Sequence, residues 1–247
     1  MGKKSNSNNL TFLEHLEELR WHLIKALLAL IVCFIISMFF AGNIFEILKE
    51  PLLELEKENL IKLYSDRLQG PFVIYLKISL MSGLVLSFPI ILFQLIRFIL
   101  PALYKSEKRF MFIGLPFSVI LFFAGTFISY KFVVPFAIRF FVMFNDYYLG
   151  IEMIVMVQNY FDLLLSMILL SGLVFQLPIV MSILARIGLI SAEKLKKWRP
   201  IAIIVIMSVS AIITPPDPFS MIAFSIPLFL LYELSVLISK YIRKKYG

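Results

Sequence analysis

Four stretches of this chain run for 19 to 23 residues each without a charged side chain: Ala26–Phe45, Ile78–Ile96, Phe110–Tyr130 and Leu163–Ala185. A helix needs about 20 predominantly apolar residues to cross the hydrocarbon core of a bilayer. Because 60% of the 247 residues are hydrophobic and only 16% are charged, a soluble fold could not bury so much apolar surface. The stretches therefore predict membrane-spanning helices and exclude a water-soluble enzyme.

Two shorter apolar runs, Ile201–Thr214 and Phe219–Tyr232, flank the turn Pro215-Pro216-Asp217-Pro218. Each run has 14 residues and reaches about 21 Å as a helix, less than a bilayer core of about 30 Å. One interpretation is a single broken re-entrant hairpin. The other is two short spans in a locally thinned bilayer. We favour two spans, because Glu233 lies close to a basic tail and its carboxylate reaches the membrane interface.

The distribution of basic residues predicts the orientation in the membrane. Seventeen of the 24 Lys and Arg residues lie in the amino-terminal segment and in the alternate segments on its side, and seven lie opposite. Cytoplasmic loops carry the excess of Lys and Arg. We therefore expect both termini in the cytoplasm, and we interpret the net charge of +8 as topology information rather than as a sign of nucleic-acid binding.

These observations predict an all-α polytopic membrane protein with six transmembrane helices, the last two of them short, in one integral membrane domain. Because no cleavable signal peptide or transit-peptide composition is evident, we expect a prokaryotic cytoplasmic (inner) membrane. The predicted parts are a cytoplasmic amphipathic start at 1–22, spans at about 23–43, 75–97, 110–131, 162–185, 200–214 and 219–239, and a cytoplasmic basic tail at 240–247, all within the domain 1–247.

Side chains for catalysis or metal binding are scarce. The single cysteine, Cys33, excludes a disulfide framework and a Cys-based metal cluster. The two histidines, His15 and His22, are interpreted as interfacial residues, because His15 lacks the second histidine that a zinc-protease helix requires. We therefore expect a non-enzymatic protein without a metal or cofactor.

Polar residues of two kinds are candidates for function. Gln176 lies midway along the fourth predicted span, beside Pro178, either as an interhelical hydrogen-bond partner or as a functional polar site. Acidic residues also occur on the basic side of the membrane, among them Glu18 on an amphipathic helix and Glu107 amid basic residues. Each glutamate either pairs with a neighbouring base, such as Arg20 or Lys108, or binds a ligand.

Four groups of motifs, in order along nearly the whole chain, share the pattern of one family. They are His15-Leu16-x-Glu18-Leu19-Arg20; Ser87-Phe88-Pro89 with Gln94, Arg97-Phe98, Pro101-Ala102-Leu103-Tyr104 and Glu107; Phe175-Gln176-Leu177-Pro178; and Thr214-Pro215-Pro216-Asp217 with Ile226-Pro227. Together they resemble TatC, the core of the twin-arginine protein translocase. The six spans and cytoplasmic termini are also similar to that family.

The resemblance implies a receptor and translocation core that exports folded proteins whose signal peptides carry consecutive arginines. It implies a concave wall of helices and dependence on the proton-motive force. The implied partners are membrane lipid and the single-span subunits TatA and TatB, or one bifunctional subunit, in homo- and hetero-oligomers. By analogy, Glu18 and Glu107 recognise the arginine pair, and Arg20 and Phe98 belong to the same signal-peptide site.

Physical chemistry agrees with this assignment. A guanidinium forks onto a carboxylate through two parallel hydrogen bonds, which an ammonium cannot reproduce. Two charge-assisted contacts of about 1.5–3 kcal/mol each supply about 3–6 kcal/mol of binding free energy in total. A complex with a millimolar dissociation constant already requires about 4 kcal/mol. The arginines therefore select the signal, and its apolar segment must add affinity.

Other positions depart from the family or complete its pattern. Gln176 stands where the family commonly has a glutamate, and Met221 stands where a glutamine is often found. With Asp217 of the last outer turn, these residues are candidates for contacts with a partner helix. Four prolines are assigned structural roles: Pro51, Pro89, Pro178 and Pro215.

Two other classes of function are weighed. The leading alternative is a small secondary transporter with a broken carboxyl-terminal hairpin, but inverted halves and ionisable midplane residues are missing from the sequence. A membrane-anchored enzyme has no motif in its favour.

Overall fold

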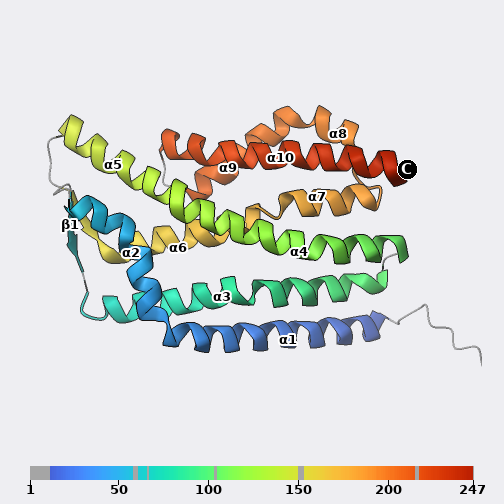
Figure 1. Cartoon of the computed structure of the whole chain (residues 1–247), viewed down its shortest axis with the longest axis horizontal. Coiled ribbons are helices and arrows are strands. Elements are labelled where there is room, and N and C mark those ends of the chain that lie inside the picture. Colours follow the sequence, from blue (N-terminus) through green and yellow to red (C-terminus); the bar gives the residue numbers. More distant parts are fainter. Residues whose placement is uncertain are drawn as a thin grey trace, which may run out of the picture.

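The computed structural model describes residues 12–57, 61–65, 67–102, 105–149, 153–214 and 217–246. Helices dominate, as the sequence predicts, and most run roughly parallel (Figure 1). Within the described residues, five helices are long and apolar enough to cross a membrane, and a shorter apolar helix covers Arg199–Ile213. Together they account for the six predicted spans.

The amphipathic start and the first span form one helix, α1 (Phe12–Phe39). Its apolar side chains are widely exposed, for example Leu27 (54%) and Val32 (55%), which suits a surface that faces lipid. A turn at Phe40 leads into α2 (Ala41–Lys57), which contains Pro51. The chain then pairs with a distant segment through strand β1 (Ile61–Tyr64).

The second span is α3 (Gly70–Ile99), with Pro89 inside it, and a 3-10 turn, η1 (Leu100–Ala102), follows. Helix α4 (Lys105–Ile128) continues through a π-helical turn, η2 (Ser129–Val133), into α5 (Val134–Leu149). This helix passes the predicted boundary at 131, because Lys131 does not end it but pairs with Glu50 of α2 at 3.4 Å.

Strand β2 (Met153–Met156) pairs in parallel with β1, Ile61 opposite Met153 and Tyr64 opposite Met156. The sequence did not predict this two-stranded sheet. In Figure 1, β1, α2 and the far end of α5 lie together at one end of the molecule.

The fourth predicted span is two helices, α6 (Val157–Val174) and α7 (Leu177–Arg186), interrupted at Phe175-Gln176. Pro178 lies in the first turn of α7, where its missing N–H leaves no helical hydrogen bond unmade. The short helix α8 (Ala192–Lys197) begins at Ser191, whose side chain accepts a hydrogen bond from the Lys194 N–H.

The last two spans differ from the expectation of two short helices. Helix α9 (Arg199–Ile213) has 15 residues, but α10 (Pro218–Tyr246) has 29, and its first 24 residues qualify as a membrane span. Glu233 lies inside α10, and its carboxylate accepts a 2.7 Å hydrogen bond from the Arg199 guanidinium of α9.

The helices are arranged as a row, with α1, α3 and α4 side by side and α7 and α10 beyond α4 (Figure 1). Between them lie fully buried large side chains such as Phe122, Phe161 and Phe224. The beginning of α1 and the end of α10 lie at the same end of the molecule, opposite α2 and β1.

Candidate functional site

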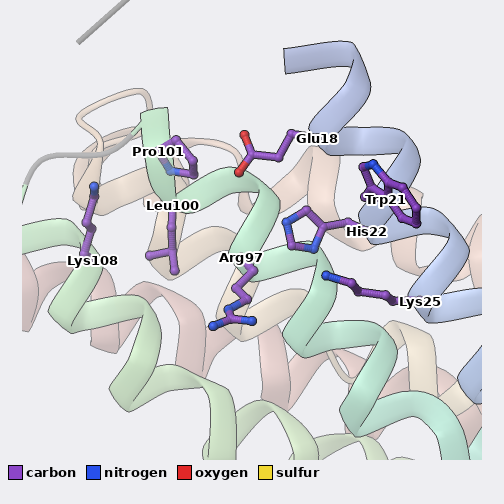
Figure 2. Close-up of a pocket in the computed structure, with 8 residues that line it drawn as sticks. All are labelled: Glu18, Trp21, His22, Lys25, Arg97, Leu100, Pro101 and Lys108. Atoms are coloured by element: carbon purple, nitrogen blue, oxygen red, sulfur yellow. The ribbon is translucent and has the colours of Figure 1, made fainter. Parts of the chain in front are cut away.

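A cavity of about 760 Å³ opens at the end of the molecule where α1 begins and α3 ends (Figure 2). Helices α1 and α3, the turn η1 and the start of α4 all contribute to it. Its lining residues are Glu18, Trp21, His22, Lys25, Arg97, Leu100, Pro101 and Lys108. This cavity is called the charged pocket below.

Helix α1 contributes four lining residues at positions 18, 21, 22 and 25. Spacings of three, four and seven residues place side chains on one face of a helix. The amphipathic pattern of the start therefore turns Glu18 into the pocket, and its carboxylate points toward η1 in Figure 2.

A hydrogen bond between two helices orders the pocket wall. His22 Nδ1 of α1 donates to Gln94 Oε1 of α3 at 2.7 Å. Gln94 precedes Arg97 by one helical turn, so the bond joins the face that carries Glu18 to the face that carries Arg97.

Three cations also line the pocket: Lys25, Arg97 and Lys108. The Arg97 guanidinium lies 5.2 Å from the centre of the Phe93 ring, a cation–π contact, and points away from Glu18 in Figure 2. The pocket therefore places a carboxylate on one side and positive charge around it.

The other residues predicted for this site are Glu107, Arg20 and Phe98, and none of them is among the described residues that line the charged pocket. Glu107 lies in the first turn of α4, one residue before Lys108, but its side chain falls outside the part of the chain that the structure describes. Arg20 is exposed, and Phe98 lies in the last turn of α3; neither is among the lining residues.

A second cavity, of about 570 Å³, adjoins the first along α3 and is called the apolar groove below. It begins at Ile96 and Ile99, next to Arg97 and Leu100 of the charged pocket, and continues between α4, α7 and α10. Its other lining residues are Phe88, Leu92, Leu95, Phe110, Met111, Ile113, Gly114, Phe117, Ser118, Leu173, Gln176, Ile179, Val180, Ser182, Ile183, Leu184 and Ile238.

Gln176, Ser118 and Ser182 are the polar side chains of this mostly apolar lining, and Gln176 and Ser118 bond to each other. The Ser118 hydroxyl donates to Gln176 Oε1, and Gln176 Nε2 donates to the Ser118 carbonyl at 3.2 Å and the Gly172 carbonyl at 3.4 Å. The amide thus makes interhelical hydrogen bonds that connect the break between α6 and α7 to α4.

Asp217 and Met221 lie at the start of α10. The Asp217 carboxylate accepts bonds from the Ser220 N–H, at 2.6 Å, and from the Ser220 hydroxyl, so it caps the helix and is buried. Met221 follows one turn later and is partly exposed. Pro215, one of the four structural prolines, lies outside the described residues.

The sequence interpretation missed part of the charged pocket. His22 was assigned only an interfacial position, and Trp21 and Lys25 were not assigned to a site. The sequence could have predicted that they lie beside Glu18, since residues three, four and seven positions apart share a helix face.

Five long apolar helices and a shorter one, with a charged pocket at one end, define a polytopic membrane protein. The sequence matches the model of one family, "Sec-independent protein translocase protein (TatC)", over residues 14–227. The chain therefore belongs to the TatC family.

Individual relatives agree with this assignment. TatC of Desulforapulum autotrophicum is 36% identical over 234 residues, which cover 95% of this chain and 86% of the relative. TatC of Escherichia coli K12 is 32% identical over 227 residues, which cover 92% and 87%.

Solved structures show the same fold. A crystal structure described as the twin-arginine translocase receptor TatC superimposes with a TM-score of 0.80 at 35% identity and covers 93% of this chain and 100% of that one. A second crystal structure of this receptor, in the detergent DDM, has a TM-score of 0.82 at 36% identity and covers 92% and 99%.

Proposed function

We propose that this chain is the receptor for twin-arginine signal peptides and the core subunit of a translocase that exports folded proteins. It acts in the prokaryotic cytoplasmic membrane as one integral domain, with both termini in the cytoplasm, and performs no enzymatic reaction. The observation that carries the proposal is the charged pocket, where Glu18 faces an open cavity at the membrane surface.

Glu18 supplies the group that distinguishes arginine from lysine. A planar guanidinium donates two parallel hydrogen bonds to one carboxylate, and a compact ammonium does not. Glu107 is proposed as the second carboxylate, since its neighbour Lys108 lines the same cavity. Arg20 and Phe98 are proposed to support this site from α1 and from the end of α3.

The cations of the pocket add specificity. Lys25, Arg97 and Lys108 repel an incoming basic peptide unless its arginines reach the carboxylates. Like-charge contacts of this kind contribute specificity rather than affinity, because they raise the free energy of binding of the wrong partners. We therefore infer that the pocket holds the arginine pair in one register.

The apolar groove supplies the remaining affinity. It begins within one helical turn of the charged pocket, at Ile96 and Ile99, so a signal peptide can place its arginines and then its apolar segment in order. Burial of apolar surface contributes about 25 cal/mol per Å². A segment that buries about 200 Å² of apolar surface therefore adds about 5 kcal/mol, comparable to what the two ionic contacts supply.

Partner subunits of the TatA and TatB type are proposed to contact the polar residues on the membrane side. Gln176 lies in the apolar groove, and Met221 is partly exposed beside the cap at Asp217. A polar partner group can join the hydrogen bonds of Gln176, because an amide offers two donors and one acceptor with two lone pairs. By family resemblance, the proton-motive force supplies the energy.

The transporter alternative loses its main support. It relied on a broken carboxyl-terminal hairpin of two short runs, whereas α10 is one helix from Pro218 to Tyr246 and is long enough to span a membrane. Among the described helices, a span is interrupted between α6 and α7. The polar side chain at that break, Gln176, accepts a hydrogen bond from Ser118.

The test is binding of a synthetic signal peptide to the full chain in detergent. A twin-arginine peptide should bind more tightly than its twin-lysine version, and Glu18→Gln should weaken it about 10- to 100-fold, the equivalent of one charge-assisted contact. Glu17→Gln is the matched control, because Glu17 is exposed and does not line the pocket. Equal binding of the two peptides to the unmutated protein would contradict the proposal.

A further inference from the structure

Two adjoining cavities at the opposite end of the molecule have no role in the proposed function. The first, of about 550 Å³, is lined almost entirely by apolar side chains of α2, α3, α4 and α6, and is called the outer groove below. Its lining residues are Ile44, Leu48, Met81, Ser82, Val85, Leu86, Phe123, Thr126, Phe127, Tyr130, Leu165, Ile168 and Leu169.

The second cavity, of about 250 Å³, carries charges of both signs and is called the mixed-charge pocket below. Glu50 and Glu54 of α2 face Lys131 of η2 and Arg139 of α5. Pro51, Tyr130, Pro135 and Phe136 complete the lining.

The ion pairs of this pocket are loose. Lys131–Glu50 and Arg139–Glu54 are both 3.4 Å apart, longer than the 2.7–2.9 Å of a strong charge-assisted hydrogen bond. All four side chains remain 48 to 59% exposed, so an incoming ligand can reach each of them. By contrast, Lys77–Asp162, an ion pair between α3 and α6, is 2.5 Å long and lines neither cavity.

Tyr130 joins the two cavities, because it lines both. Its hydroxyl donates to the Ile47 carbonyl at 2.6 Å and lies 3.3 Å from Glu50, which holds the ring at the junction. An elongated ligand that passes Tyr130 would have an apolar part on one side and a charged part on the other.

The level of Tyr130 suits a lipid headgroup. Lys131 follows Lys108 by 23 residues, about 35 Å of helix, and a bilayer core is about 30 Å thick. Lys108 lines the charged pocket at one membrane surface, so Lys131 lies near the other surface. Headgroups there are level with the mixed-charge pocket, and acyl chains are level with the outer groove.

We propose that the two cavities together bind one phospholipid whose headgroup carries both a phosphate and a primary ammonium, as in phosphatidylethanolamine. An acyl chain occupies the outer groove, the phosphate lies between Lys131 and Arg139, and the ammonium contacts Glu50 and Glu54. Charge complementarity selects this occupant, because an anionic lipid leaves the two carboxylates without a cation and a purely apolar partner helix leaves all four charges unused. The site does not depend on the proposed receptor function.

The test is native mass spectrometry of the delipidated full chain in detergent with two added phospholipids. Dioleoyl phosphatidylethanolamine should bind about tenfold more tightly than dioleoyl phosphatidylglycerol, the equivalent of one charge-assisted contact. The double variant Glu50→Gln/Glu54→Gln should abolish this preference, whereas Lys131→Gln/Arg139→Gln should weaken both lipids. Asp162→Asn removes the short ion pair outside the cavities and should change neither affinity.

Three results would overturn the proposal. They are equal affinities of the unmutated protein for the two lipids, a preference that survives in the glutamate variant, and equally tight binding of free phosphoethanolamine, which would identify a soluble ligand instead. A measurement on the unmutated protein guards against misfolded variants: phosphatidylethanolamine with a photoreactive acyl chain should label peptides containing Met81–Leu86 or Phe123–Tyr130. Labelling confined to other helices would equally contradict the site.

Discussion

His22 and Gln94, 72 residues apart in the sequence, are joined by a 2.7 Å hydrogen bond across the wall of the charged pocket. The bond links α1, which carries Glu18, to α3, which carries Arg97. It therefore holds the face of α1 that carries Glu18 against the face of α3 that carries Arg97.

This bond predicts a positioning role for both residues. Gln94→Leu or His22→Phe should weaken binding of a twin-arginine peptide by up to about tenfold, since a hydrogen bond contributes about 0.5–1.5 kcal/mol net. The double variant should be little worse than either single variant, because both remove the same contact. Titration of the labelled peptide measures all four proteins, and effects that simply add would show that the two residues act separately.

Gln176 gives the second prediction. Gln176→Leu leaves the Ser118 hydroxyl without its acceptor and should cost about 1–3 kcal/mol of stability. Gln176→Glu should be tolerated, because a protonated acid still accepts from Ser118 and donates. We expect the leucine variant alone to lose partner subunits on co-purification and to export less of a folded reporter. Full export activity of the leucine variant would make Gln176 incidental to function.

Topology gives the third prediction. Seventeen basic residues on the side of the amino terminus against seven on the other predict that both termini and segments 97–109 and 186–199 lie in the cytoplasm. Cysteines introduced at Leu68 or Tyr147, both highly exposed, should react with an impermeant thiol reagent from outside intact cells. Labelling of a tag at the carboxyl terminus from outside would contradict the six-span arrangement.

The sequence predicted the spans because the signal is local. Uncharged runs such as Ile78–Ile96 lie within the observed helices, and the helical spacing of the start turns Glu18 into a pocket. What it did not predict depends on distant residues. The contact between Glu233 of α10 and Arg199 of α9 could not be predicted, and β1 forms only because β2 lies beside it. Four-residue strands so far apart carry no signal of their pairing, because each strand is too short to be periodic.

The site was predicted to a similar extent. Glu18 was assigned on the pattern of its neighbours, but the hydrogen bond of His22 could not be predicted, because its partner lies on another helix. Likewise, the break at Phe175-Gln176 was not predicted, although Pro178, in the first turn of α7, is a local sign of a helix boundary. Tertiary contacts decided the first of these features, and a proline within an otherwise apolar run indicated the second.

Gly83 of α3 lies directly against the backbone of α1. A Cβ atom at this position would lie 2.7 Å from the Phe34 Cα and 2.8 Å from the Phe34 nitrogen, nearer than side-chain atoms approach backbone. Because the obstacle is backbone, Gly83→Ala must push the two helices apart. Such overpacking costs about 1–3 kcal/mol.

The displacement should also reach the charged pocket, since α1 carries Glu18 and His22. We expect Gly83→Ala to lower the midpoint of thermal unfolding in detergent and to weaken binding of the twin-arginine peptide together. Gly42→Ala is the matched control: Gly42 lies in helix α2 and lines neither the charged pocket nor the apolar groove, and a Cβ there would meet only the Tyr75 hydroxyl, at 3.6 Å. Alanine at position 42 should leave binding unchanged and lower stability little or not at all, because this distance is an ordinary van der Waals contact. Identical unfolding midpoints for the two variants would mean that α1 and α3 tolerate separation, and that the close approach at Gly83 does not position the pocket.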